Sequence, residues 1–267
     1  VPDNFSTFYK HVNFLKVSNT LVALQQLTTH HRKAFDIPVV GITGSNGKTM
    51  VKEWLSQLLS YDRNVTRSPK SYNSQIGVPL SVWLLNESSQ IGLIEAGISK
   101  VGEMQALHDI ILPTVGVLTS LGAAHQENFS SLEEKCNEKL LLFKGTQALV
   151  YQLDDKIAAK CITAAHYDGQ LLAWSEHDTT AAFYVNSIEK HETTSTINYI
   201  WQQTTQGSYT LPFIDDASIS DSITCAVVAL HFGVQPDVLA QRMAVLEPVA
   251  MRLEVKEGQH GCTLIND

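Results

Sequence analysis

The chain has 267 residues and a mass of 29.5 kDa, which suffices for one large domain or two modest ones. Hydrophobic residues make up 44% and charged residues 17%, so we expect a globular protein with a substantial core rather than a disordered chain. The net charge is −8 and no run of Lys or Arg occurs, which argues against binding to nucleic acid or to an anionic membrane surface. No apolar stretch approaches the roughly 20 residues of a membrane-spanning helix, so we expect no membrane insertion.

Cysteine usage and the two ends of the chain add weaker indications. The cysteines are widely spaced and form no CxxC motif, which favours a reducing cytoplasm over a disulfide scaffold or a zinc ribbon. The first residue is not Met, no signal-peptide pattern follows it, and the last residues resemble the middle of a strand. These features suggest a cytoplasmic protein and a piece of a longer chain.

Strands and helices alternate through the first two thirds of the chain. Val17, Leu21, Leu24 and Leu27 are spaced by four, three and three, which predicts one face of an N-terminal helix. Further apolar runs predict buried parallel strands at residues 37–43, 91–96, 114–119, 148–153 and 171–174. Amphipathic spacing predicts helices at residues 50–59, 132–143 and 154–165. This alternation indicates an α/β fold, a parallel sheet with helices on both faces.

The pattern changes near residue 180. Stretches rich in Thr and aromatic residues predict a small antiparallel subsheet with strands at residues 183–188, 194–202 and 208–213. Gln206-Gly207 is predicted to form a turn of this subsheet. Helices at residues 218–232 and 236–246 and a strand pair at residues 252–256 and 263–265 are expected to follow, with a domain boundary near Glu247-Pro248.

The segment Gly44-Ser45-Asn46-Gly47-Lys48-Thr49 carries the strongest functional indication. It follows a predicted strand and opens a predicted helix, where glycines let backbone N–H groups turn toward phosphate oxygens and the helix terminus favours negative charge. In this arrangement Lys48 would contact the terminal phosphates, and Thr49 would offer its hydroxyl to Mg²⁺. The strict GxxxxGK[ST] pattern is not met, because its first Gly would fall at Ile42. The order of strand, loop and helix nevertheless predicts a phosphate loop that binds ATP and Mg²⁺.

This loop resembles that of the Mur ligases and folylpolyglutamate synthetases, a family that forms amide bonds through an acyl phosphate. Further segments are similar to family motifs over nearly the whole chain: Tyr72–Pro79 to YNNxxGxP, Glu95-Ala96-Gly97 to a magnesium-binding ExG, and His125–Phe129 to H-x₃-F. Lys139 lies 14 residues after His125, where the family carries a carbamylated lysine. The resemblance therefore implies a P-loop sheet of the central-domain type.

The resemblance also implies roles for individual residues. The residues expected to act in catalysis are Lys48, Asn73, His125 and Lys139. The expected magnesium ligands are Thr49, Glu95, His125 and Lys139. The residues expected to bind ATP are Gly44, Ser45, Asn46, Gly47, Lys48, Thr49, Asp221, Arg252 and Asp267.

Each of these roles has an ordinary structural alternative. Asn73 is also a common turn residue, and Lys139 could be a helix lysine that covers apolar neighbours. Glu138 lies beside Lys139, but helical periodicity directs it elsewhere. Asp221 departs from the family, which usually has Asn there; an ionised carboxylate accepts hydrogen bonds but cannot donate one to a base, so we expect altered adenine recognition. Asp221 could also simply cap its helix.

Within the family, the asparagine-containing segment Tyr72–Pro79 and Lys52-Glu53-Trp54 are similar to those of members that add D-alanyl-D-alanine to UDP-MurNAc-tripeptide in peptidoglycan synthesis. The segments Glu95–Ser99 and Glu138-Lys139-Leu140 are similar to those of the form fused to an alanine racemase. The resemblance implies a remnant of an N-terminal UDP-sugar domain at residues 1–34, a central ATP-binding domain at 35–248, and the start of a truncated C-terminal domain at 249–267.

Three other functions stay open. One is another ligase of the family, for example one that adds glutamate to folate. Another is a module that binds ATP and Mg²⁺ without catalysis, since closure of a missing domain would complete the site. The last is a P-loop switch or motor with basal hydrolysis regulated by a partner.

Overall fold

The computed structural model describes residues 13–122, 128–249, 254–257 and 262–266. Its main feature is a nine-stranded sheet in the order β2-β3-β1-β4-β5-β6-β7-β8-β9. The strands are β1 (Val39–Thr43), β2 (Val65–Arg67), β3 (Ile91–Glu95), β4 (Val115–Leu118), β5 (Ala148–Gln152), β6 (Gln170–Ser175), β7 (Phe183–Lys190), β8 (Ser195–Trp201) and β9 (Thr205–Leu211). The helices are α2 (Thr20–Arg32), α3 (Lys48–Leu59), α4 (Gly77–Val82), α5 (Met104–Ile111), α6 (Leu132–Leu140), the 3₁₀ helix η2 (Leu141–Phe143), α7 (Lys156–Ala164), α8 (Asp216–His231) and α9 (Pro236–Met243).

Strands β1 to β7 form the parallel part of the sheet, with β1 between β3 and β4. All residues of β1, β3 and β4 are buried, as the continuous apolar runs predict for strands covered on both faces. The carboxyl ends of these strands lie at one edge of the sheet, where ligands bind in open α/β folds. The predicted α/β fold is confirmed.

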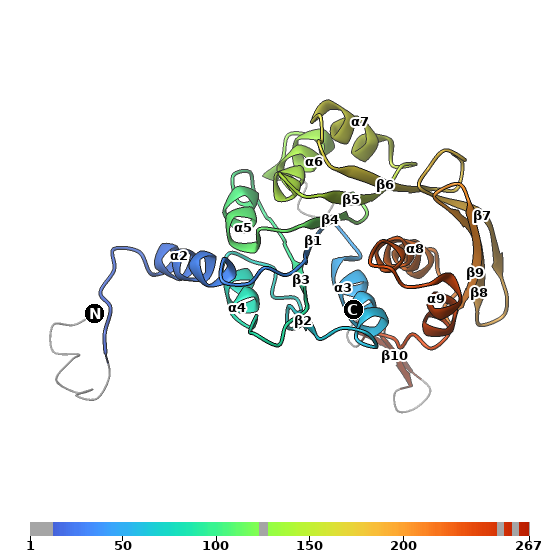
Figure 1. Ribbon diagram of the computed structural model, residues 1–267, viewed down its shortest axis with the longest axis horizontal. Helices are drawn as coiled ribbons and strands as arrows, with labels where there is room; N and C mark the ends of the chain where they lie inside the picture. Colours follow the sequence, from blue (N-terminus) through green and yellow to red (C-terminus); the bar gives the residue numbers. More distant parts are fainter. Residues whose placement is uncertain (1–12, 123–127, 250–253, 258–261, 267) are drawn as a thin grey trace.

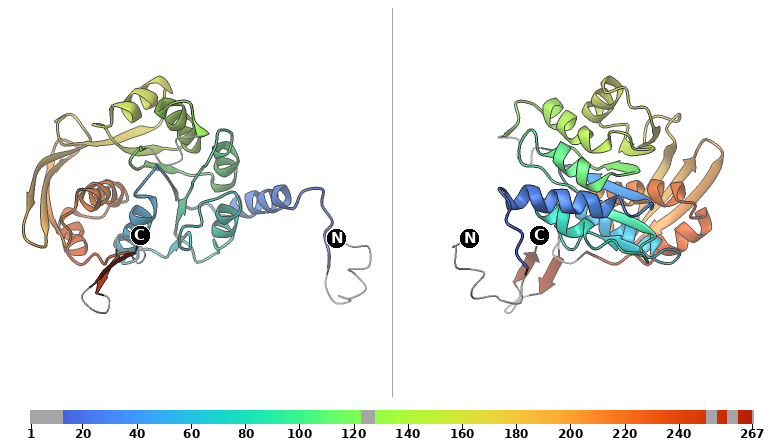
Figure 2. Two further views of the ribbon diagram at one scale, coloured as in Figure 1. Left: turned by 180° about the vertical axis from the view of Figure 1, so that it is seen from behind. Right: turned by 60° about the vertical axis from the view of Figure 1, so that its left-hand side comes forward.

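Helices cover both faces of the curved sheet. Figure 1 shows α3, α8 and α9 on its concave side, whereas α4, α5, α6 and α7 lie on the other side. Successive strand residues point to opposite faces, so Val40 and Ile42 join the core beneath α3 and α8, whereas Val39 joins the core beneath α5. The rotated views in Figure 2 show the same two layers.

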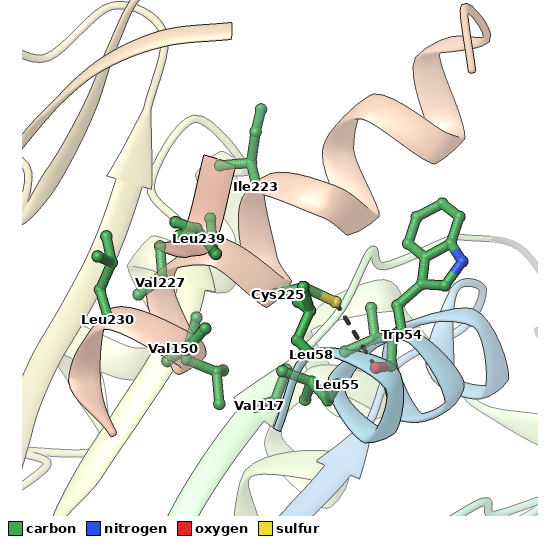
Figure 3. Close-up of a cluster of buried hydrophobic side chains, with 14 of the residues drawn as sticks. Trp54, Leu55, Leu58, Val117, Val150, Ile223, Cys225, Val227, Leu230 and Leu239 are labelled. Atoms are coloured by element: carbon green, nitrogen blue, oxygen red, sulfur yellow. Dashed lines mark hydrogen bonds between the residues drawn. The ribbon is translucent and has the colours of Figure 1, made fainter. Parts of the chain in front are cut away.

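The core on the concave side is the larger of the two clusters (Figure 3). Leu55 and Leu58 of α3 pack toward Val117 and Val150 of the sheet and toward the middle of α8. Trp54 points away from the two valines and stacks on Phe213. Cys225 is fully buried there, and its Sγ lies 3.6 Å from the carbonyl oxygen of Val51. This packing fixes α3, whose first turn continues the loop between β1 and α3.

The antiparallel strands extend the main sheet instead of forming a separate one. β7 pairs with β6 in parallel and with β8 antiparallel, and β9 completes the edge. The predicted turn at Gln206-Gly207 is wrong, because both residues lie inside β9. The chain reverses after Trp201 instead, where Gln202 and Gln203 have φ values of 47° and 63°.

The N-terminal helix exists, but its predicted face is only partly correct. Helix α2 begins after Val17, and Leu27 is 51% exposed. Its buried residues are Thr28 and Arg32, whose polar groups find backbone carbonyl partners; for example, Arg32 Nε donates to the carbonyl oxygen of Ile111 over 2.8 Å. Helix α2 contacts α4 and α5, and Arg32 joins it to the carbonyl oxygens of Ile111 and Leu112 at the end of α5.

The C-terminal strand pair is confirmed: β10 (Glu254–Glu257) and β11 (Thr263–Asn266) form an antiparallel ladder. The four cysteines are free thiols. Among the described residues, no helix combines the length and the apolar character needed to cross a bilayer.

Candidate active site

The loop between β1 and α3 has the geometry of a phosphate-binding turn. The Ser45 N–H donates to the carbonyl oxygen of Ser120 over 2.7 Å, which holds the loop against the end of β4. A Cβ atom on Gly44 would lie 1.8 Å from Thr119 Oγ1, so no larger residue fits there. Gly47 has a φ of 81°, which glycine adopts without strain. Lys48 Nζ folds back onto the carbonyl oxygens of Gly44 and Ser45, at 3.1 and 3.0 Å.

A carboxylate closes one side of this loop. Glu95 ends β3 and is 1% exposed. Thr49 Oγ1 donates to Glu95 Oε2 over 3.0 Å, and Asn73 Nδ2 donates to Glu95 Oε1 over 2.7 Å. The three predicted site residues therefore meet, although Asn73 arrives from the loop before α4. Two oxygen donors, the Thr49 hydroxyl and the Glu95 carboxylate, form a group of hard ligands that suits Mg²⁺.

Two cavities adjoin at the loop. One, of about 290 Å³, is lined by Ser45 to Met50, Asn73, Glu95, Ala217 and Asp221. The other, of about 330 Å³, is lined by Lys135 and Lys139 together with Gln75, Gly97 and Glu103. Gly44, Ser45, Lys48 and Asn73 border the second cavity, and Ser45, Lys48 and Asn73 border both. A chemical group held between Lys48 and Asn73 is thus accessible from both cavities.

Lys139 lies at the wall of the second cavity. It is 3% exposed, and its Nζ donates to the carbonyl oxygen of Gly44 over 3.0 Å. Burial, with the nearby cations Lys48 and Lys135, lowers the pKa of Lys139 to about 7. A substantial fraction of the amine is therefore neutral near physiological pH. A neutral amine is the form that can react with CO₂.

Glu138 points away from this cavity. Its Oε1 accepts the N–H groups of Gly102 and Met104, over 2.9 and 3.0 Å, at the start of α5. Glu138 therefore holds the start of α5, whereas Lys139 lines the cavity, as their different directions on α6 predict.

Asp221 lies against the phosphate loop from helix α8. A Cβ atom on Gly47 would lie 2.3 Å from Asp221 Oδ1, so the carboxyl group and the loop are in close contact. Burial and the nearby Asp215 raise the pKa of Asp221 to about 7, against the opposing effect of Lys48. The N-cap of α8 is Asp215, not Asp221, so the simple capping interpretation of Asp221 is wrong.

Three predicted residues, His125, Arg252 and Asp267, lie outside the described residues. Conversely, the structure adds two buried lysines that the sequence did not single out for the site. Lys135 is 2% exposed, and its Nζ donates to the carbonyl oxygen of Gly122 over 2.6 Å. Lys52 is fully buried and lies near Glu95. The sequence signal for Lys52 was its position three residues after Thr49, on the same face of α3.

Comparison with known proteins identifies the family. The family model of the Mur ligase middle domain matches residues 42–229 of this chain. UDP-N-acetylmuramoyl-tripeptide–D-alanyl-D-alanine ligase of Bacillus subtilis (strain 168) is 28% identical over 262 residues, which cover 94% of this chain and 54% of that protein. The enzyme of the same name from Synechocystis is 38% identical over 109 residues, which are 41% of this chain and 24% of that protein. The chain spans about half the length of the Bacillus relative.

Solved structures share the fold. MurF from Acinetobacter baumannii superposes with a TM-score of 0.85 at 23% identity, covering 95% of this chain and 55% of that one. MurF ligase from Thermotoga maritima, solved in complex with ADP, has a TM-score of 0.81 at 24% identity, covering 96% and 59%. Because the family match extends over most of the chain and includes the phosphate loop and Glu95, this protein belongs to the Mur ligase family through its middle domain.

Proposed function

We propose that this chain is the ATP-binding part of a ligase that adds D-alanyl-D-alanine to UDP-MurNAc-tripeptide in peptidoglycan synthesis. The observation that carries the proposal is the junction of two cavities at Lys48 and Asn73, with Thr49 and Glu95 on one side and Lys139 on the other. Such a junction lets a phosphoryl group pass from a nucleotide in one cavity to a carboxylate in the other. The name of the Bacillus subtilis relative supports this choice of substrates.

The reaction has two steps. A carboxylate oxygen of the tripeptide attacks the γ-phosphorus of ATP, ADP leaves, and an acyl phosphate forms. The amine of D-alanyl-D-alanine then attacks the acyl carbon, inorganic phosphate leaves, and the amine loses a proton. Phosphoryl transfer depends mainly on positioning and on stabilisation of developing negative charge.

The cavity lined by residues 45–50 and Glu95, which we call the nucleotide cavity, supplies the groups for the first step. The N–H groups of residues 44–49 and the start of α3 hold the phosphates, and Lys48 exchanges its carbonyl partners for phosphate oxygens. Thr49 and Glu95 would hold Mg²⁺, which when bound would neutralise negative charge on the phosphates. Asn73, already bonded to Glu95, orients this carboxylate. It also borders the second cavity, the one lined by Lys135 and Lys139, which we call the acyl cavity.

The acyl cavity has a separate role. Its wall carries Lys135, whose positive charge favours an anionic substrate group. We further propose that Lys139 reacts with CO₂ to form a carbamate, as the family resemblance implies. In this reaction the neutral amine forms a bond to the carbon of CO₂ and releases one proton. The carbamate, together with His125, would then serve a second Mg²⁺.

Calorimetry of Mg²⁺–ATP binding tests the nucleotide site directly. We expect binding to the parent chain, a loss of at least tenfold in affinity for Lys48→Ala, and no loss for Lys156→Ala at the start of the distant helix α7. Equal binding by the parent chain and Lys48→Ala would overturn the phosphate-loop assignment.

Phosphate release then tests the substrates. The expected stimulus in a protein that contains this chain is UDP-MurNAc-tripeptide with D-alanyl-D-alanine. Stimulation by a folate and glutamate instead would identify a different ligase of the family. Nucleotide binding without release under any of these conditions would identify a binding module.

A further inference from the structure

Lys52 is a fully buried cation that the proposed reaction does not use. Its side chain has no exposed surface and lines neither of the two cavities. Its Nζ lies 3.1 Å from Glu53 Oε1 and 3.8 Å from Glu95 Oε2. Burying a lysine is costly unless its charge is compensated. The chain therefore maintains the cluster of Lys52, Glu53 and Glu95 at an energetic cost.

Lys52 also binds the loop that carries Asn73. Its ammonium group donates to the carbonyl oxygen of Lys70, which has a φ of 47°, in the left-handed region. Only glycine and a few polar residues adopt this region readily, so the surroundings must hold the loop in this shape. Lys52 is one of the contacts that do so, and it comes from the helix that begins at the phosphate loop.

The same loop determines the position of Glu95. Ser68 Oγ accepts the N–H of Glu95 over 3.1 Å, and the Gly97 N–H donates to the carbonyl oxygen of Asn73 over 2.8 Å. The Asn73 amide then donates to Glu95 Oε1. Through Lys70 and Asn73, Lys52 therefore joins the phosphate helix to the carboxylate expected to hold the metal.

We propose that Lys52 is a positioning residue for the Mg²⁺ site: it anchors the loop of residues 68–73 and thereby keeps Asn73 and Glu95 aligned with Thr49. This inference rests on the proposed function, because it requires that Glu95 serve as a metal ligand. Removing a residue that orients a metal ligand commonly lowers the affinity for the metal about 10–100-fold.

The outer part of the cluster supplies a matched control. Glu53 is 20% exposed, and its Oε2 accepts Arg67 Nε over 2.8 Å at the surface. Glu53→Gln removes the ion pairs of Glu53 with Arg67 and with Lys52 but leaves the contacts of Lys52 with Lys70 and Glu95. The double variant Lys52→Met/Glu53→Gln removes the anchor and leaves Glu95 with its hydrogen bonds from Thr49 and Asn73. The two variants differ only in Lys52.

The experiment measures the Mg²⁺ concentration that half-saturates binding of a fluorescent ATP analogue. We expect Lys52→Met/Glu53→Gln to need about 10–100-fold more Mg²⁺ than Glu53→Gln, with little change in metal-free binding measured in EDTA. A difference below about threefold, or tighter Mg²⁺ binding, would overturn the proposal, because Lys52 would then be only structural or would compete with the metal.

Two further measurements make the result decisive. If the double variant does not fold, Lys52→Gln/Glu53→Gln replaces it. The glutamine amide is too short to reach both Lys70 and Glu95, so we expect the same increase in the Mg²⁺ requirement. A difference below about threefold would again overturn the proposal. The parent chain and Lys48→Ala are measured alongside. If the parent binds the analogue no better than Lys48→Ala, the proposed function fails; if it binds better and only the Lys52 effect is missing, this inference alone fails.

Discussion

Asp221 is expected to make nucleotide binding depend on pH. Its carboxyl group touches Gly47 of the phosphate loop, so an ionised Asp221 would repel a bound polyphosphate. With a pKa of about 7, it is mostly neutral at pH 6 and mostly ionised at pH 8. The neutral acid can also donate a hydrogen bond, as an Asn amide does. Affinity for Mg²⁺–ATP should therefore fall as the pH rises.

The magnitude follows from linkage. If the nucleotide binds only the protonated form, apparent affinity falls by about tenfold between pH 6 and pH 8, because each pH unit above the pKa costs about 1.36 kcal/mol. This is an upper limit, since Lys48 compensates part of the repulsion. Calorimetry at pH 6, 7 and 8 measures the fall, and Asp221→Asn is the control that removes the titrating group while titration of ATP itself stays the same.

Asp221→Asn should also change how the free energy of unfolding depends on pH. A pKa raised from 3.8 to about 7 on folding means that the folded state binds the proton more tightly. The resulting stability is complete below the unfolded value and is lost as the pH rises through about 7, with an upper limit of about 4 kcal/mol. Asp221→Asn should therefore gain stability relative to the parent at pH 8 but not at pH 3.5, as measured by urea unfolding. Parallel pH profiles of the parent and the variant, in binding and in unfolding, would refute this argument.

Three further predictions concern the surroundings of the site. Glu138→Ala should destabilise the chain by about 1–2 kcal/mol in urea unfolding, because two N–H groups at the start of α5 lose their acceptor, whereas nucleotide affinity should change little. Gly116→Ala should cost about 1–3 kcal/mol, because its Cβ would lie 2.4 Å from the Phe143 ring; unchanged stability would contradict this packing. With ¹³CO₂, a carbamate signal should be visible by NMR in the parent, grow between pH 6 and pH 8 as Lys139 loses its proton, and be absent from Lys139→Met.

The sheet was predictable because its strands are covered on both faces. Continuous apolar runs such as Val39–Thr43 are required by this burial, and their order with the intervening helices indicates a parallel sheet. Sites at strand ends follow from the same logic, which is why Glu95 and the loop of residues 44–49 were found together. Helix α4 was missed, because six residues give too little periodicity. Helix α5 was missed as well, although it is as long as the predicted helix α9.

The misplaced turn shows why a glycine can mislead. Gly207 lies opposite Tyr199 in the β8–β9 ladder, and a Cβ atom there would lie 2.4 Å from the Tyr199 ring. The glycine is therefore needed to accommodate a buried aromatic ring, not to reverse the chain. The reversal falls to Gln202 and Gln203, which adopt positive φ values although neither is a glycine. The position of Gly207 follows from the pairing of β8 with β9, which no local sequence pattern contains.

Lys139 and Asp221 illustrate a more general limit of the sequence. They reach the same loop from α6 and α8, which lie on opposite faces of the sheet (Figure 1). Their pKa values both approach about 7, one lowered and one raised, because burial at this junction disfavours either charge. Near neutral pH the two groups can thus both be uncharged beside the phosphate loop. Because the two residues respond to the same burial, opening the junction to water should return both pKa values toward their ordinary range at once.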